Sequence, residues 1–168
     1  MGKEELKYIF TEKEIVEVNE LVCFKKHMTP ITGVLFGLDI SDFPMELTYK
    51  DGKKNGVSRV RYLDGQIKSE ENYKDNERDG LSKRWNKNGQ LKFEGYYKDG
   101  LLDGLIKKWH NNGQLVSEEN YKDGEWNGVS KEWNKDGQLK FQGNFKDGDL
   151  DGLVKRWNDN GELESEEN

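Results

Sequence analysis

The sequence of 168 residues has few apolar side chains for its length: 32% of the residues are hydrophobic and 36% are charged, with a mean hydropathy of -1.07. Such a balance makes a thick two-layer core hard to build and, taken alone, is typical of disordered chains. However, 11% of the residues are aromatic and the 19 glycines are regularly spaced, which favours a thin repeat whose units each bury one modest face. The net charge of -6 argues against nucleic acid or an anionic membrane as the main partner, because both select basic surfaces.

The start of the chain and its single cysteine bear on the compartment. Cys23 has no partner for an internal disulfide, so folding does not require an oxidising environment. The first ten residues contain no apolar signal segment, and Leu6 stands where myristoylation requires Ser or Thr. The longest apolar stretch, Ile31 to Leu38, is too short to span a bilayer. We therefore expect a cytoplasmic protein, unless a leader has been removed.

Residues 1–23 lie outside any repeat and are expected to form an N-terminal cap. Tyr8 to Phe10 and the run from Ile15 to Phe24 are candidate strands that would cover the first edge of a sheet. An amphipathic helix over Glu12 to Leu21 is the alternative. Residues 24–48 then form a degenerate repeat before the regular ones begin.

Residues 49–168 divide into five units of 24 residues without an insertion. Three ladders mark them: an aromatic residue opens each unit, and two glycines follow at fixed positions. The openings are Tyr49, Tyr73, Tyr97, Tyr121 and Phe145; the glycines are Gly56, Gly80, Gly104, Gly128 and Gly152, then Gly65, Gly89, Gly113, Gly137 and Gly161. Tryptophans recur with the same period at Trp85, Trp109, Trp133 and Trp157. This regularity predicts a repeat protein.

Each unit is interpreted as two short strands, because apolar and polar residues alternate on either side of a glycine turn. A three-residue loop with Gly89 at positive φ pairs Trp85 with Leu91 and Lys83 with Phe93, and so keeps apolar residues on one face. The large residues Phe93 and Phe141 alternate with Ser69, Ser117 and Ser165 in successive units. Alternating sizes allow neighbouring hairpins to interdigitate.

The motif of residues 49–168 reads Y-K-D-G-x-x-(D/N)-G-(L/V) followed by W/Y-x-x-(D/N)-G-(Q/E)-L. It resembles the bacterial variant of MORN repeats, particularly the YwqK-type antitoxins of toxin–antitoxin systems. The resemblance extends upstream, where Phe24-Lys25 is similar to a unit opening and Pro30 to Val34 to the entry of the first hairpin; Asp39 to Asp42 lacks the family's Asn-Gly turn. The resemblance implies an all-β fold, an elongated single-layer twisted antiparallel sheet of β-hairpin repeats, used for protein–protein contact.

Nothing in the sequence indicates an enzyme, a metal site or a cofactor. His27 and His110 fall in different units, and neither has a second His or Cys nearby, so a zinc site is not expected. The Ser-Glu-Glu-Asn segments would point their carboxylates to opposite faces of a strand, which favours solvated charge over cation binding. The Lys-Asp-Gly motifs lack the ligand series of a calcium loop and are interpreted as turns.

Two surface features are candidate partner-binding sites. The first is a basic ladder, predicted to lie on the face of the tryptophans, with Glu71, Glu119 and Glu167 diagonally opposite; its members are Arg59, Lys83, Lys107, Lys131 and Lys155. It either forms cross-strand ion pairs or lines a groove for an acidic segment. The second feature is a rim at the connections between units, where apolar residues replace polar ones; its members are Leu101, Leu102, Trp126 and Leu150. The rim side chains either bind a partner or fold back over the neighbouring hairpin.

These observations predict a non-enzymatic module that binds one protein partner. A toxin that the chain would neutralise is one candidate for this partner. Trp126 is the expected anchor of the contact, so that replacing it with Ala would weaken binding and leave the fold intact. A peripheral membrane module and a structural spacer or homodimer are the alternatives. No nucleic-acid partner is expected, and the acidic net charge disfavours a membrane.

Overall fold

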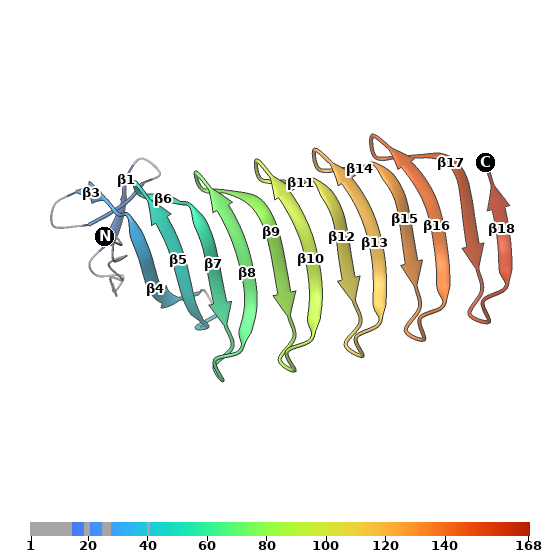
Figure 1. The fold of residues 1–168 in the computed structure, drawn as a ribbon, viewed down its shortest axis with the longest axis horizontal. Helices are drawn as coiled ribbons and strands as arrows, with labels where there is room; N and C mark the ends of the chain where they lie inside the picture. Colours follow the sequence, from blue (N-terminus) through green and yellow to red (C-terminus); the bar gives the residue numbers. More distant parts are fainter. Residues whose placement is uncertain (1–14, 19–20, 25–27, 40) are drawn as a thin grey trace, which may run out of the picture. The chain divides into compact units, whose positions relative to one another are not determined.

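The computed structural model describes residues 15–18, 21–24, 28–39 and 41–168, and this part of the chain contains strands, turns and loops without a helix (Figure 1). The strands form a small sheet, ordered β1-β2-β3, and one open antiparallel sheet of 15 strands with β4 and β18 at its ends. The prediction of an all-β fold with a single open sheet of hairpin repeats is confirmed.

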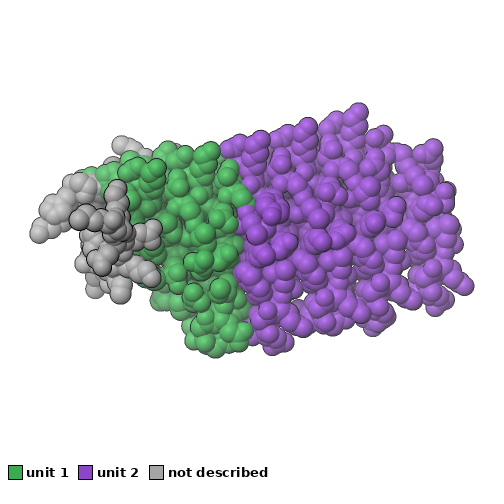
Figure 2. Space-filling view, viewed as in Figure 1, with its two compact units in different colours: residues 1–80 green, residues 81–168 purple. Residues whose placement is uncertain are grey.

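The chain divides into two compact units, residues 1–80 and 81–168, coloured separately in Figure 2. The first unit holds β1 (Ile15–Val18), β2 (Leu21–Phe24), β3 (Thr29–Pro30), β4 (Gly33–Leu38), β5 (Pro44–Lys50), β6 (Lys53–Lys54), β7 (Gly56–Arg61) and β8 (Ile67–Lys74). The boundary falls within β9 (Glu77–Trp85). The second unit continues with β10 (Leu91–Lys98), β11 (Leu101–Leu102), β12 (Gly104–Trp109), β13 (Leu115–Lys122), β14 (Glu125–Trp126), β15 (Gly128–Trp133), β16 (Leu139–Lys146), β17 (Asp149–Trp157) and β18 (Leu163–Glu167).

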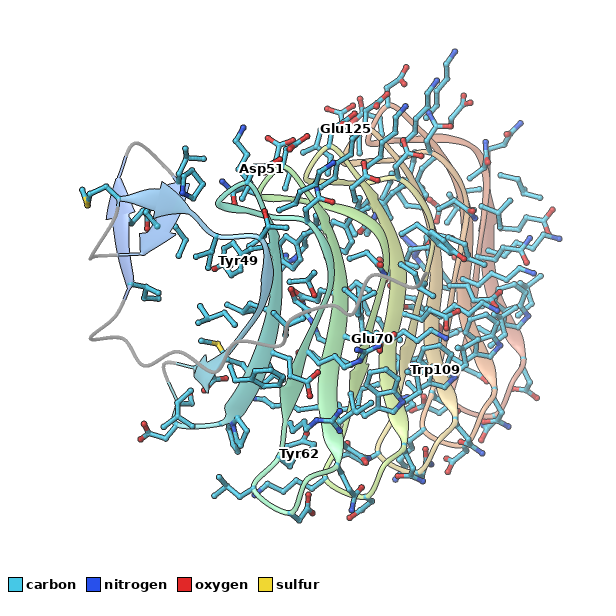
Figure 3. The ribbon with its side chains drawn as sticks, turned by 60° about the vertical axis from the view of Figure 1, so that its left-hand side comes forward. Tyr49, Asp51, Tyr62, Glu70, Trp109 and Glu125 are labelled. Atoms are coloured by element: carbon cyan, nitrogen blue, oxygen red, sulfur yellow. The ribbon has the colours of Figure 1, made fainter. Side chains whose placement is uncertain are left out.

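In the first unit, the small sheet takes the place of a preceding repeat. The amide of Gly52 donates to the carbonyl of Ile31, and the amide of Ile31 donates to Val22, at 2.7 and 3.0 Å. Ile31, Leu35 and Tyr49 form a buried cluster against which aliphatic side chains of the small sheet pack, and Figure 3 shows Tyr49 on the side that faces this sheet. The register therefore gives Val22, rather than Phe24, the place of a unit opening.

Strands β1 and β2 also decide between the two interpretations of the N-terminal segment. They occupy Ile15–Val18 and Leu21–Phe24 and pair antiparallel, so the described part of this segment is extended and not helical. The candidate strand from Tyr8 to Phe10 lies outside the described residues. Downstream, Asp39 closes the turn between β4 and β5 without an Asn-Gly pair, because its carboxylate accepts from the amides of Ser41 and Phe43 at 2.8 and 3.0 Å. Pairing of β4 with β5 is regular from Gly33 to Leu38.

In the second unit, each repeat hairpin turns through the predicted three-residue loop. His110 and Gln114 close one such loop by a backbone hydrogen bond of 2.8 Å, and Trp109 pairs with Leu115 as expected. Gly113 has a φ of 86°, a conformation that a β-branched residue fits badly. Gly89 and Gly137 share this conformation, with φ values of 76° and 82°, which confirms the predicted loop geometry.

The predicted register is wrong beyond Trp109, because the hairpin of β12 and β13 contains a β-bulge there. Val116 is the extra residue: Lys108 pairs with Ser117 and Lys107 with Glu118, so Lys107 does not face Ser117. A bulge moves every later residue of the strand to the other face. The same shift occurs between Glu132 and Trp133. The expected pairing of lysine with the Phe or Ser position is therefore replaced by pairing with the first glutamate of the Glu-Glu segment.

Consecutive repeats are joined by two-residue loops, Asp75-Asn76 between the first two repeats and Asp-Gly between the later ones. Asp123 and Gly124 both have positive φ, 51° and 88°, the pattern of the tight hairpin turn whose twist matches that of the flanking strands. The amide of Gly124 donates to the carbonyl of Leu102 at 2.8 Å, and Gly148 donates to Trp126 at 3.0 Å. These two loops are thus attached to the rim strand of the preceding repeat.

Candidate binding surface

The bulge gives the sheet of the second unit two chemically different faces. Lys108 pairs with Ser117 and Ile106 with Glu119 on one face, and Lys107 pairs with Glu118 on the other. We call the first the aromatic face, which also carries Phe93, Tyr97, Tyr121, Phe141 and Phe145, and the second the lysine face, which carries Lys83, Lys107, Lys131 and Lys155. By strand alternation, Trp109 shares the lysine face, as the sequence predicted.

On the lysine face, the basic ladder forms ion pairs across the hairpins. Lys83 meets Glu94 at 2.8 Å, Lys107 meets Glu118 at 2.9 Å and Lys155 meets Glu166 at 3.0 Å. Five of these six side chains are about one third exposed and Glu166 is 46% exposed, so each pair contributes about 0.5 kcal/mol. The expected partners Glu119 and Glu167 belong to the opposite face, which corrects the sequence interpretation. Lys131 differs from its neighbours, since the register places Gln142 opposite it.

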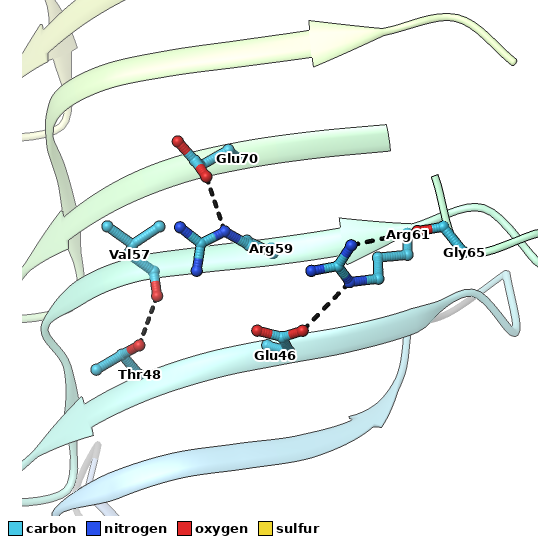
Figure 4. Close-up of polar contacts among 7 residues, drawn as sticks. All are labelled: Glu46, Thr48, Val57, Arg59, Arg61, Gly65 and Glu70. Carbon is cyan, nitrogen blue, oxygen red and sulfur yellow. Dashed lines mark hydrogen bonds and ion pairs between the residues drawn. The ribbon is translucent and has the colours of Figure 1, made fainter. Parts of the chain in front are cut away.

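The first unit repeats this pattern (Figure 4). The guanidinium Nε of Arg59 donates to Glu70 at 2.7 Å, while that of Arg61 donates to Glu46 at 3.2 Å. Arg61 also donates to the carbonyl of Gly65 in the hairpin loop at 3.2 Å. Arg61 therefore bonds both to its own hairpin loop and to the preceding strand, which is a structural role.

On the aromatic face, Glu119 is 4% exposed and is held by three side chains. The Lys108 ammonium donates to both of its oxygens at 2.8 and 3.0 Å, the Ser117 hydroxyl donates at 2.7 Å and the Tyr121 hydroxyl at 2.9 Å. Burial acts to raise the pKa of Glu119, but the bonds from Lys108, Ser117 and Tyr121 outweigh it and hold this pKa below its usual value.

The alternate repeats fill the same space with apolar atoms. Where Ser117 and Glu119 stand in one repeat, the preceding repeat has Phe93 and Gly95, and the Phe93 ring lies over Gly95. A Cβ on Gly95 would come within 2.6 Å of Ile106 Cδ1 and 2.9 Å of the Phe93 ring. The sequence predicted alternation of large and small residues at one position. The structure shows that a second position, two residues later, compensates for it.

In the first unit, Glu71 has a related network. The hydroxyl of Tyr73 donates to it at 2.6 Å, and Arg78 lies 3.2 Å away as its ion-pair partner. Burial, together with the neighbouring Glu71 carboxylate, raises the pKa of Tyr73 to about 12. The phenol therefore stays protonated as a hydrogen-bond donor and is not poised for acid–base chemistry.

The structure brings only one of the predicted rim residues to the face of the lysines. In the register, Leu102, Trp126 and Leu150 lie opposite Tyr97, Tyr121 and Phe145 on the aromatic face, whereas Leu101 lies opposite Lys98 on the lysine face. Trp126 packs edge-on against Phe145, with ring centroids 4.5 Å apart, and against Tyr121 at 6.3 Å. Of the two interpretations of the rim, packing over the next hairpin therefore applies to Trp126. Leu150 and Leu101 are 50% and 51% exposed.

Sequence reasoning missed an exposed apolar row on the lysine face. The row comprises Tyr96, Leu105, Val129 and Leu153, which are between 37% and 49% exposed. Three of them follow the repeat glycine directly, and Tyr96 stands where the other repeats have Asn. Matching Lys107 to Glu118 instead of Ser117 would have revealed the bulge and, with it, the face of this row.

The part of the chain that the structure describes holds no group of three or more His, Cys, Asp or Glu side chains that could bind a metal ion. His110 lies in a hairpin loop, and its ring Nε2 is buried without a hydrogen-bond partner among the described residues. His27 falls outside the described residues. No helix in the described part is long and apolar enough to cross a membrane.

Repeating hairpins joined by two-residue loops define a β-hairpin repeat protein. The model of the MORN repeat variant family matches five consecutive segments, which together cover more than half of the chain: residues 54–75, 78–99, 102–123, 126–147 and 150–168. The chain belongs to this family, whose repeats are binding modules linked to proteins or membranes and are not typically catalytic. No curated protein matches it.

Proposed function

We propose that this chain is a non-enzymatic, cytoplasmic module that binds a protein partner, in the manner of the YwqK-type antitoxins of bacteria that its repeats resemble. The observation that carries the proposal is the exposure of Leu101 and Leu150, about half of each side chain. Leu101 stands where every other repeat has a charged residue, and Leu150 where the first two repeats have Lys54 and Arg78. An apolar side chain exposed at a turn gains stability when a partner removes it from water.

The rim can bind without a large rearrangement. Its backbone is fixed by the bonds from Gly124 to Leu102 and from Gly148 to Trp126, so little conformational entropy is lost on association. Trp126 supports this surface from below through its contact with Phe145. Leu150, opposite Phe145, then supplies the apolar contact on the aromatic face, and Leu101, opposite Lys98, adds apolar surface on the lysine face.

A peripheral membrane role is the second candidate, since MORN repeats are linked to membranes as well as to proteins. The lysine face could meet anionic headgroups locally. Against this, Lys83, Lys107 and Lys155 are neutralised by carboxylates, and the chain carries a net charge of -6. We therefore favour a protein partner.

Two parallel assays test the proposal with the full chain. Immobilised protein is exposed to native lysate, and the free protein is floated with vesicles containing anionic lipid. We expect the wild-type chain to retain a specific protein and the Leu150→Arg variant to lose it. Arginine is tolerated at this position of the repeat, because the second repeat has Arg78 there. Flotation with vesicles and no retained protein would overturn the proposal in favour of the membrane. If a protein is retained equally by the wild-type chain and by the Leu150→Arg and Leu101→Glu variants, the rim is not the binding site.

A further inference from the structure

We propose that the lysine face of the second unit binds an acidic amphipathic helix of the partner, laid across the strands along the row Tyr96, Leu105, Val129 and Leu153. This inference rests on the proposed protein-binding function and adds a second surface, on the face opposite Leu102, Trp126 and Leu150, with a defined partner chemistry.

The row is continuous in the register of the sheet. Glu94 pairs with Lys107, and continuing this register places Tyr96 beside Leu105 on the neighbouring strand. Leu105 pairs with Asn120, whose side-chain amide donates to the carbonyl of Val129 at 2.7 Å. Asn144 follows Val129 in the same way and donates to the backbone beside Leu153, at Asp151, at 3.0 Å. Along this line, asparagines whose side chains are hydrogen-bonded to the neighbouring backbone thus alternate with exposed apolar side chains.

The spacing of the apolar members favours a helix as the occupant. Leu105, Val129 and Leu153 lie on β12, β15 and β17, with one strand between each two, so they are about 10 Å apart. Seven residues of an α-helix advance about 10.5 Å and return to nearly the same side. An extended segment covers about 10 Å in three residues, but its residues i and i+3 point to opposite sides. A helix with apolar residues at i, i+7 and i+14 therefore fits Leu105, Val129 and Leu153, the three members of the row on β12, β15 and β17.

The charge beside the row selects an acidic helix. Lys131 lies two residues from Val129 on the same strand and faces Gln142, whereas the equivalent positions in the other four repeats are Glu70, Glu94, Glu118 and Glu166. Its neighbour on the other side, Glu118, is already bound to Lys107 at 2.9 Å. The ammonium of Lys131 therefore has a neutral glutamine opposite it, where the equivalent basic residues have a glutamate.

Two further departures from the repeat lie on the lysine face, on β10 and β11. Tyr96 replaces the Asn of every other repeat, and Leu101 replaces a residue that is charged in all of them. Leu101 faces Lys98, where the later repeats set Glu125 against Lys122 and Asp149 against Lys146. Three substitutions have thus added apolar surface or removed negative charge on one face, which is the combination an acidic amphipathic partner would bind.

Because other repeats carry the alternative residues, each feature can be reverted without disturbing the fold. The variants are Tyr96→Asn, Leu101→Glu and Gln142→Glu. Gln138→Glu is the matched control: it makes the same change of charge four residues away, in an exposed loop where the last repeat has Glu162. Leu150→Arg controls for the rim on the aromatic face.

The probe is a fluorescein-labelled 21-residue peptide with leucines at helical spacing and glutamates elsewhere, and its counterpart has lysine for every glutamate. Fluorescence anisotropy with the full chain should show saturable binding of the acidic peptide alone. Tyr96→Asn and Gln142→Glu should each weaken it about tenfold, and Leu101→Glu should do so as well. Gln138→Glu and Leu150→Arg should change it less than twofold.

Several results would overturn the inference: no binding of the acidic peptide, equal binding of both peptides, or equal effects of Gln142→Glu and Gln138→Glu. Binding of anionic vesicles that is lost with Gln142→Glu, without peptide binding, would assign the face to a membrane. Self-association that is lost with Tyr96→Asn, again without peptide binding, would assign it to a second copy. Failure of the proposed function is detected separately, by lysate capture, so the two can be distinguished.

Discussion

On the aromatic face, successive repeats carry either a Ser and Glu pair, as at Ser117 and Glu119, or a Phe and Gly pair, as at Phe93 and Gly95. Replacing Glu119 alone with Gly tests whether both residues of a pair must change together. The substitution removes the acceptor of Lys108, Ser117 and Tyr121 and leaves a cavity under a face that contains the buried Ile106. Removing one partner of a buried ion pair costs about 3–5 kcal/mol. The Lys108 side chain is 45% exposed and can regain water, so we expect the lower end, about 3 kcal/mol.

Adding Ser117→Phe to Glu119→Gly should restore part of this loss, because the ring would cover the glycine as Phe93 covers Gly95. Neighbouring substitutions of this kind couple by about 0.5–3 kcal/mol, and we expect at least about 1 kcal/mol of recovery. Urea unfolding, followed by tryptophan fluorescence and far-UV circular dichroism, measures both variants and Ser117→Phe alone. The reasoning is refuted if the double variant is no more stable than Glu119→Gly, or if Glu119→Gly matches the wild type.

Four further outcomes are expected. Gly95→Ala should lower stability by about 1–3 kcal/mol, because its Cβ meets Ile106 and Phe93, whereas Gly37→Ala, whose Cβ meets the mobile end of Met45 at 3.3 Å, should be nearly neutral in the same urea titration. Gly113→Val should cost about 1 kcal/mol or more through its positive φ; an unchanged melting temperature would contradict the loop geometry. Trp126→Ala should lower thermal stability as well as binding, because the ring packs on Phe145; a variant as stable as the wild type would restore the purely partner-binding role. The lowered pKa of Glu119 gives stability that is present above the unfolded-state pKa and is lost as pH falls through the folded one, so acid unfolding should be less steep in Glu119→Gln, and identical acid profiles would count against it.

The sequence was sufficient to predict the hairpins, their loops and the positive φ of Gly113, because glycine and aromatic positions recur with one period and turn geometry is local. It was insufficient for the faces beyond the bulge. The bulge depends on contacts across two strands, where Lys107 pairs with Glu118 and Lys108 with Ser117. The alternation of residues within one strand does not reveal these contacts.

The candidate site shows the same division. The exposure of Leu101 and Leu150 could be predicted from their departure from the repeat, and their position at the rim from the loop. The packing of Trp126 on Phe145 could not, since it joins residues of successive repeats through side-chain geometry. The apolar row containing Tyr96 was missed because the uncorrected register placed its neighbours in the core.

A comparison of two baits tests most directly the claim that this chain is a protein-binding module acting through its second unit. Wild-type chain and a variant carrying Tyr96→Asn, Leu101→Glu and Leu150→Arg, all residue types that other repeats place there, are immobilised and exposed to the same native lysate. Quantitative mass spectrometry of the retained proteins should show one protein enriched at least about tenfold on the wild-type bait, as loss of interface anchors predicts. Identical profiles from two equally folded baits would contradict the account.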